Sequence, residues 1–100
     1  MAKRAPLHPG KILLHEFLNE LGITSYALAK RVGVPTNRIT GIVNGDRSIS
    51  ADTALRLGRF FGNSPEFWMN LQMHYDLKLA ERRSGRQIRQ VVQQSSVISA

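Results

Sequence analysis

Apolar residues recur along the chain at the three- and four-residue spacing of α-helices, and almost no segment alternates as a strand would. Glycine ends four of these helical segments, because it easily adopts the left-handed conformation that closes a helix. The pattern therefore predicts an all-α fold of five short helices, which end at Gly22, Gly33, Asn44-Gly45, Gly62 and about Arg83.

Polar residues that can cap a helix stand before three of these segments. Thr24, Ser50 and Ser64 can each offer a side-chain oxygen to the free backbone N–H groups of the first turn. Pro35 is expected in the first turn of the third helix, where its missing N–H group costs nothing. These signals predict where the second to fifth helices begin.

The chain breaks one helix at Gly33 and restarts another within a few residues. Leu28 and Val32 lie one turn apart before the break, and Ile39 and Ile42 lie about one turn apart after it. Both helices can therefore share a core, while the glycine permits a sharp turn between them. This arrangement is typical of a helix-turn-helix, which we place at residues 25–44.

The third helix has an outward face of short hydrogen-bonding groups, which a helix used only for packing does not need. Base edges in the major groove of DNA present donors, acceptors and thymine methyl groups to such a face. We therefore expect base contacts from Thr36, Asn37, Thr40 and Gly41. Cationic residues around this face are expected to contact phosphates, namely Lys30, Arg31, Arg38 and Arg47.

Gly41 is unusual inside a helix, where glycine costs about 1 kcal/mol relative to alanine. Close approach of DNA to the backbone would offset this cost, and so would tight helix–helix packing. The sequence leaves both explanations open. It also leaves open the simpler interpretation that the polar face is only solvated.

The composition agrees with a DNA partner. A net charge of +7 over 100 residues favours polyanions, nucleic acid foremost. The absence of cysteine excludes disulfides and thiolate metal sites, and it indicates a reducing cytoplasm. No apolar run approaches the roughly 20 residues of a membrane span, and the basic N-terminus lacks the apolar core of a signal peptide.

No group of residues predicts catalysis or metal binding. His8 and His15 have no acidic or cysteine partner at ligand spacing, and no phosphate-binding glycine loop is present. We therefore expect no enzymatic activity, no metal and no cofactor.

The fifth helix carries an aromatic segment, and its residues Phe67, Trp68, Leu71 and Tyr75 have helical spacing. The simplest interpretation places them in the core and rim of a small domain. Because apolar residues occupy more than one face of this helix, the same four are candidates for a dimer interface. A dimer suits DNA reading, since two half-sites about 34 Å apart need two reading helices related by symmetry.

We expect the domain to span residues 1–83 and a polar tail, partly helical or flexible, to span residues 84–100. Ile88, Val91 and Val92 share one face of a possible helix in this tail. A second subunit or another partner protein would have to cover them, because the tail alone cannot bury enough surface to become ordered. The final residues are expected to be mobile.

The chain resembles the lambda-repressor-like, Xre-type helix-turn-helix family in the stretches HPGKIL and SYALAKRVGVPTNRITGIVNGDRSISADTALRLGRFFG. A third stretch, SPEFWMNLQMHYDL, is similar to the HigA/VapI group of antitoxins within that family. The resemblance implies a five-helix lambda-repressor-like domain with a C-terminal extension, and it places Ser25 beside a phosphate.

The same resemblance implies a homodimer that binds a palindromic operator, represses its own operon and holds a small RNA-cleaving toxin inactive. Two alternatives remain open at this point. One is a solitary Xre-type regulator without a toxin, and the other is a module that binds only proteins.

Overall fold

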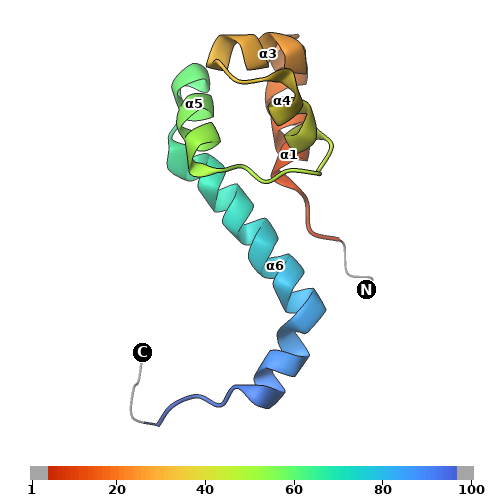
Figure 1. Cartoon of the computed structure of the whole chain (residues 1–100), viewed down its shortest axis with the longest axis vertical. Helices are drawn as coiled ribbons and strands as arrows, with labels where there is room; N and C mark the ends of the chain where they lie inside the picture. Colours follow the sequence, from red (N-terminus) through yellow and green to blue (C-terminus); the bar gives the residue numbers. More distant parts are fainter. Residues whose placement is uncertain (1–4, 97–100) are drawn as a thin grey trace.

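The computed structural model describes residues 5–96, and every regular element in this range is helical. Three elements follow one another without a break and form a single rod, which contains a π-helical segment, η1. The predicted all-α fold of five helices is therefore confirmed. Its elements are α1 (Pro9–Ile12), η1 (Leu13–Leu18), α2 (Asn19–Leu21), α3 (Ser25–Val32), α4 (Thr36–Val43), α5 (Ala51–Phe61) and α6 (Pro65–Val91). Figure 1 shows the shorter helices gathered at one end of the molecule and α6 extending away from them.

Polar side chains cap three of the helices, as the sequence predicts. Thr24, Ser50 and Ser64 each accept a hydrogen bond from the backbone N–H three residues further on, at 3.0–3.2 Å. Each bond satisfies a donor that has no partner inside its helix. The starts of α3, α5 and α6 are therefore determined by local sequence.

A single core forms where the shorter helices meet the first half of α6. All the apolar residues that the sequence places on the inner face of the helix-turn-helix are buried in it. At the crossing of α1 and α4, the buried Gly10 allows the two backbones to approach with no side chain between them. The buried apolar residues of the core are Leu13, Leu18, Leu28, Ala29, Val32, Ile39, Ile42, Ile49, Ala54, Leu57 and Trp68.

Trp68 is the largest side chain of this core, and none of it is exposed. Its ring lies 4.9 Å from that of Phe17 between centroids, and its Nε1 donates a hydrogen bond to Oδ1 of Asn63 at 2.9 Å. The indole therefore has no surface left to bury against a second subunit. The expectation that Trp68 belongs to a dimer interface is wrong, and the alternative that it belongs to the core is confirmed.

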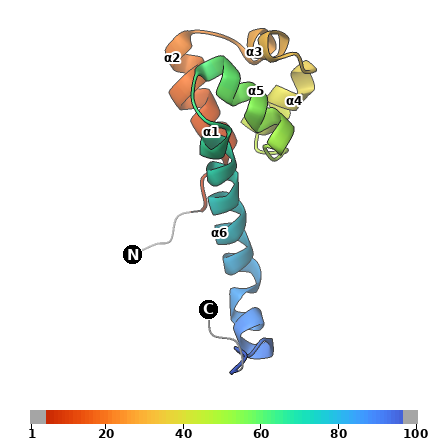
Figure 2. The same ribbon diagram turned by 90° about the vertical axis from the view of Figure 1, so that its left-hand side faces the viewer.

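α6 is longer than the sequence indicated. The predicted end near Arg83 is wrong, because the helix continues to Val91. The segment from residue 84 to about 92, expected to become helical when covered, is helical here up to Val91 within a single chain. Figures 1 and 2 show from two directions that the second half of α6 extends beyond the other helices.

A glycine inside this second half does not end the helix. The carboxylate of Glu81 lies over Gly85 and accepts a hydrogen bond from Nη1 of Arg89 at 2.5 Å. This ion pair spans two helical turns, and it can do so because Gly85 has no side chain in its path. No helix within residues 5–96 is long and apolar enough to cross a membrane.

Candidate nucleic-acid interface

The turn between α3 and α4 has the geometry that the sequence predicts. Gly33 has a φ of 76°, and its N–H donates to the carbonyl oxygen of Ala29 at 2.9 Å. A side chain is strained in this left-handed conformation, so glycine is the natural residue for the turn. Pro35 departs slightly from the expectation, because it is the N-cap of α4 and the helix begins one residue later, at Thr36.

On the outward face of α4, the side chain of Asn37 is more exposed than those of Thr36 and Thr40. Asn37 is exposed, and its amide makes no hydrogen bond to any other described residue. Thr36 and Thr40 are half-buried, and the Thr40 hydroxyl donates to the carbonyl oxygen of Thr36 at 3.3 Å. Asn37 is therefore the group of this face that is best placed to bind a ligand through both its donor and its acceptor.

Gly41 lies on the same face, and the chain itself explains why it is glycine. Its carbonyl oxygen accepts the N–H groups of Asp46 and Arg47 at 2.8 and 3.1 Å. A Cβ atom at this position would lie 3.3 Å from the Cβ of Arg47, whose side chain lies across the glycine. The turn after α4 therefore packs directly on Gly41, an explanation that differs from both sequence-based alternatives.

The cationic residues predicted to contact phosphate have different surroundings. Lys30 and Arg31 are exposed in the last turn of α3, and Nζ of Lys30 lies 5.5 Å from the centroid of the Tyr26 ring. Ser25 is half-buried at the start of the same helix. Arg47 is exposed beside Gly41. Four of the five predicted residues thus flank the two helices of the motif.

Arg38 is the exception, because an ion pair within the chain holds it. Its Nη1 lies 2.7 Å from Oδ2 of Asp52, and the same oxygen lies 2.8 Å from Nε of Arg56. Hydrogen bonds from the guanidinium groups of Arg56 and then Arg38 lower the pKa of the Asp52 carboxyl from its ordinary value of 3.8. In the unbound chain Asp52 therefore holds this guanidinium, and its contact with phosphate stays a prediction.

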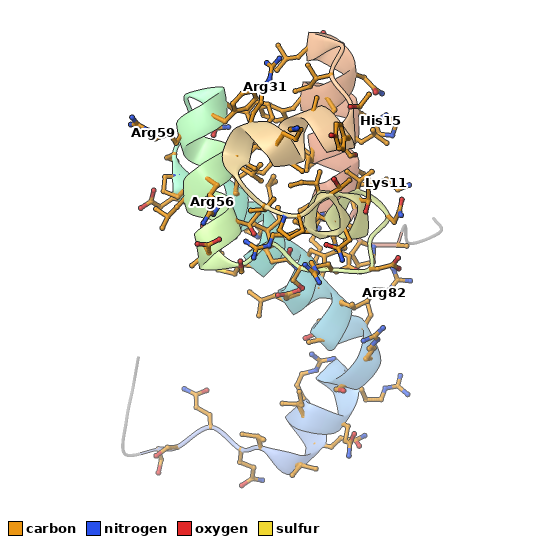
Figure 3. The ribbon with its side chains drawn as sticks, turned by 45° about the horizontal axis from the view of Figure 1, so that its top comes forward. Lys11, His15, Arg31, Arg56, Arg59 and Arg82 are labelled. Carbon is orange, nitrogen blue, oxygen red and sulfur yellow. The ribbon has the colours of Figure 1, made fainter. Side chains whose placement is uncertain are left out.

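Arg56 was missed by the sequence analysis. Its Nη1 donates to the carbonyl oxygens of Val32 and Gly33 at 2.7 and 3.3 Å, so it caps the end of α3 at the turn. Figure 3 shows Arg56 and Arg59 on α5, across the shorter helices from Lys11 and His15. The four-residue spacing of Asp52 and Arg56 could have predicted their ion pair, although not the contact with the turn.

His8 contacts both the start of α1 and the side of α6. Its Nδ1 accepts the N–H of Gly10 at 2.9 Å, which caps the helix that begins at Pro9. Its ring lies 4.8 Å from that of Tyr75 on α6, edge to face. Burial lowers the pKa of His8 from its ordinary value of 6.5, although the carboxylates of Asp76 and Asp46 act in the opposite direction.

Among the other residues of the aromatic segment, Leu71 and Tyr75 are half-buried, whereas Phe67 is exposed. Phe67 packs edge to face against Trp68, with ring centroids 5.0 Å apart. Leu71 is half-buried against the core, and Tyr75 contacts His8. Only Phe67 keeps a large exposed surface among these four predicted interface residues. Within residues 5–96, no group of three or more histidine, aspartate or glutamate side chains could hold a metal ion.

Comparison with known proteins agrees with this geometry. A family model described as helix-turn-helix matches residues 14–68, which contain α3, α4 and α5. Antitoxin HigA-1 of Vibrio cholerae is 44% identical over 75 residues, which are 75% of this chain and 70% of that protein.

Two solved structures are similar over nearly their whole length. An addiction module antidote protein of the HigA family from Coxiella burnetii is 50% identical, with a TM-score of 0.87 over 92% of this chain and 100% of that one. Antitoxin HigA of Pseudomonas aeruginosa, solved with the higBA promoter, is 46% identical, with a TM-score of 0.86 over 88% of this chain and 96% of that one. The chain therefore belongs to the helix-turn-helix family and, within it, to the HigA group of antitoxins.

Proposed function

We propose that this protein binds operator DNA upstream of its own gene as a homodimer, with α4 in the major groove, and acts in the cytoplasm as the antitoxin of a toxin–antitoxin pair. The observation that carries the proposal is the exposed, unbonded amide of Asn37 on a helix whose other side is packed in the core. The Pseudomonas relative, solved with the higBA promoter, supports the same use of the motif.

The contacts follow from the positions of the side chains. Asn37 can pair with adenine through both atoms of its amide, and Thr36 and Thr40 lie beside it on α4. Phosphate contacts come from the residues around the motif that lack an ion pair within residues 5–96, namely Ser25, Lys30, Arg31 and Arg47. Gly41 contributes by letting Arg47 lie close against this face.

The homodimer is supported by a second apolar face on α6. Spacings of three and four residues place this face opposite the one that carries Trp68 and Leu71. Its large members are exposed, and an exposed apolar stripe of this length is typical of a surface that binds another protein. The apolar residues of the outer face of α6 are Met69, Met73, Leu77, Ala80, Ile88 and Val91, with Ser84 between the last two and the rest.

We propose that a second copy of the chain covers the outer face of α6, because a dimer suits the binding of an operator. A two-fold axis along the projecting half of α6 would present two copies of α4, as an operator with two half-sites requires. The dimer residues proposed here therefore lie on the same helix as those predicted from the sequence, α6, but they are different residues. The cause is that Trp68, Leu71 and Tyr75 lie on the inner face.

Fluorescence anisotropy tests the function. The probes are a DNA fragment from upstream of the gene and an unrelated fragment of equal length and base composition. We expect tighter binding to the first, with a steep loss of affinity as salt is added. Equal affinity for both fragments would contradict sequence-specific binding.

The antitoxin role is tested separately by co-expressing the product of the adjacent reading frame. Growth arrest by that product alone, and rescue by this chain, are expected. A product that does not arrest growth would leave a solitary DNA-binding regulator.

A further inference from the structure

One carboxylate joins the three helices that surround the helix-turn-helix turn. Oδ2 of Asp52, in the first turn of α5, accepts Nη1 of Arg38 from α4 at 2.7 Å and Nε of Arg56 at 2.8 Å. Arg56 in turn donates to the carbonyl oxygen of Val32 at the end of α3. The position of the Arg38 guanidinium is thus determined by a residue outside the motif.

Arg38 follows Asn37 directly in the first turn of α4. A guanidinium at this place, if it were not held, would be carried to the DNA together with the base-reading residues. It would then add an attraction to phosphate that is the same for every sequence. Such an attraction raises the affinity for all DNA and so reduces the advantage of the operator over competing sites.

The ion pair has little value for stability alone, because both side chains are well exposed to solvent, 32% for Arg38 and 56% for Asp52. The ion pair matters more for the local charge than for stability. Asp52 is the carboxylate that pairs with both guanidinium groups beside α4, those of Arg38 and Arg56. Removing that carboxylate would leave two adjacent cations that repel each other. Arg38 would then turn towards solvent, the side from which DNA approaches α4.

We propose that Asp52 is a specificity-determining residue: it holds the Arg38 guanidinium against α5 and so withholds a sequence-independent phosphate contact from the reading helix. This inference rests on the proposed function, because it concerns discrimination between DNA sequences. Asp52 acts through Arg38 and touches no base itself.

The test compares salt dependence in five variants of the full chain, measured with the upstream fragment and the unrelated fragment. Asp52→Asn keeps the shape of the side chain and removes its charge. We expect tighter binding to unrelated DNA and a smaller ratio between the two affinities. The plot of log K against log salt for unrelated DNA should steepen by about 0.9 for each new phosphate contact, hence by about 1.8 for a dimer.

Two variants assign the effect to Arg38. Arg38→Gln alone should leave the salt slope unchanged, because Asp52 already holds this guanidinium. The double variant Asp52→Asn with Arg38→Gln should return the slope to the wild-type value. Asp46→Asn serves as the matched control, because it removes one exposed carboxylate from the turn after α4 without touching Arg38. Adding Arg38→Gln to it should change nothing further.

Two results would overturn the inference. One is an unchanged slope and affinity ratio in a folded Asp52→Asn protein, as judged by circular dichroism. The other is a shallower slope in Arg38→Gln alone, which would mean that Arg38 leaves Asp52 and contacts phosphate in the wild-type complex. If the wild-type protein itself does not distinguish the two fragments, the proposed function fails instead, and the two failures are thereby separable.

Discussion

Gly10 and Ile42 lie in direct backbone contact where α1 crosses α4: a Cβ atom on Gly10 would be 1.7 Å from the carbonyl oxygen of Ile42. The neighbouring Cα of Val43 would be 3.0 Å away. Because these are backbone atoms of a packed helix, they cannot move aside as a flexible side chain could. The contact therefore determines how closely α4 is held against α1.

Gly10→Ala should accordingly destabilise the protein by about 3 kcal/mol, the upper part of the range for overpacked sites. For a chain of this size the melting temperature should fall by more than about 10 °C. Gly85→Ala is the control, because the atoms nearest to its added Cβ belong to the flexible end of the Glu81 side chain. Thermal unfolding followed by circular dichroism compares them, and similar melting temperatures for the two variants would contradict the predicted close contact.

Asn37→Ala tests base reading. The variant should lose about 1–3 kcal/mol of discrimination per half-site, because the amide can no longer pair with a base edge. Binding to unrelated DNA should hardly change, since this side chain is not charged. Anisotropy titrations with the two fragments measure both affinities. An equal loss on both would show that Asn37 only positions the protein.

Arg47→Ala should have the opposite effect to Asn37→Ala on DNA binding. Affinity for any DNA should decrease, and the salt slope should become shallower by about 0.9 per subunit, because one phosphate contact is lost. Arg47→Lys keeps the charge and should keep the slope. If the alanine variant instead loses only operator binding, Arg47 contacts a base and its assignment to phosphate is incorrect.

The proposed role of the outer face of α6 in dimerisation can be tested by placing charged side chains on it. Leu77→Asp combined with Ile88→Asp should give a folded monomer in sedimentation experiments, because two carboxylates per chain would be buried in the two-fold interface. Leu55→Asp is a matched control on α5, since Leu55 and Leu77 are 61% and 62% exposed. The control should sediment like the wild-type protein, and an unchanged dimer in the double variant would exclude this face.

His8 should make the stability of the fold depend on pH. Burial lowers the pKa of the folded state below the ordinary 6.5, so the unfolded chain binds more protons between these two values. The free energy of unfolding should thus be at its full value above about pH 6.5 and should decrease as the pH falls below it. Protonation of Nδ1 would also remove the acceptor for the N–H of Gly10.

Urea unfolding at pH 7.5 and pH 5.5 measures this dependence. His8→Asn is the control, because asparagine can cap a helix and does not titrate in this range. Its unfolding midpoint should change less between the two pH values than that of the wild type. The same pH dependence in both proteins would assign the effect to other groups.

Local features of this protein were predictable because neighbouring residues produce them. The caps at Thr24, Ser50 and Ser64 and the left-handed turn at Gly33 involve atoms within a few residues of one another. Helical periodicity likewise predicts which side of α3 and α4 is apolar, and therefore which side of α4 is left for DNA. These signals predicted the all-α fold and the motif.

Periodicity does not say which of two apolar faces lies inside. α6 has Trp68 and Leu71 on one face and Met73 and Leu77 on the opposite one, and both pairs have the three- or four-residue spacing of a helix. Only the packing of α6 against the other helices decides that the first face is the core. For this reason the sequence prediction included Trp68, a fully buried core residue, among the dimer residues.

Other features of the structure depend on contacts between residues that are far apart in the chain. The ion pair of Arg38 and Asp52 spans 14 residues, and the bond from Arg56 to Val32 spans 24. No local pattern specifies such pairs, because they depend on the angles and distances at which whole helices cross. The sequence by itself determined that α4 has a polar outward face, whereas the tertiary structure decided that Arg38, among the neighbouring cations, is held by Asp52.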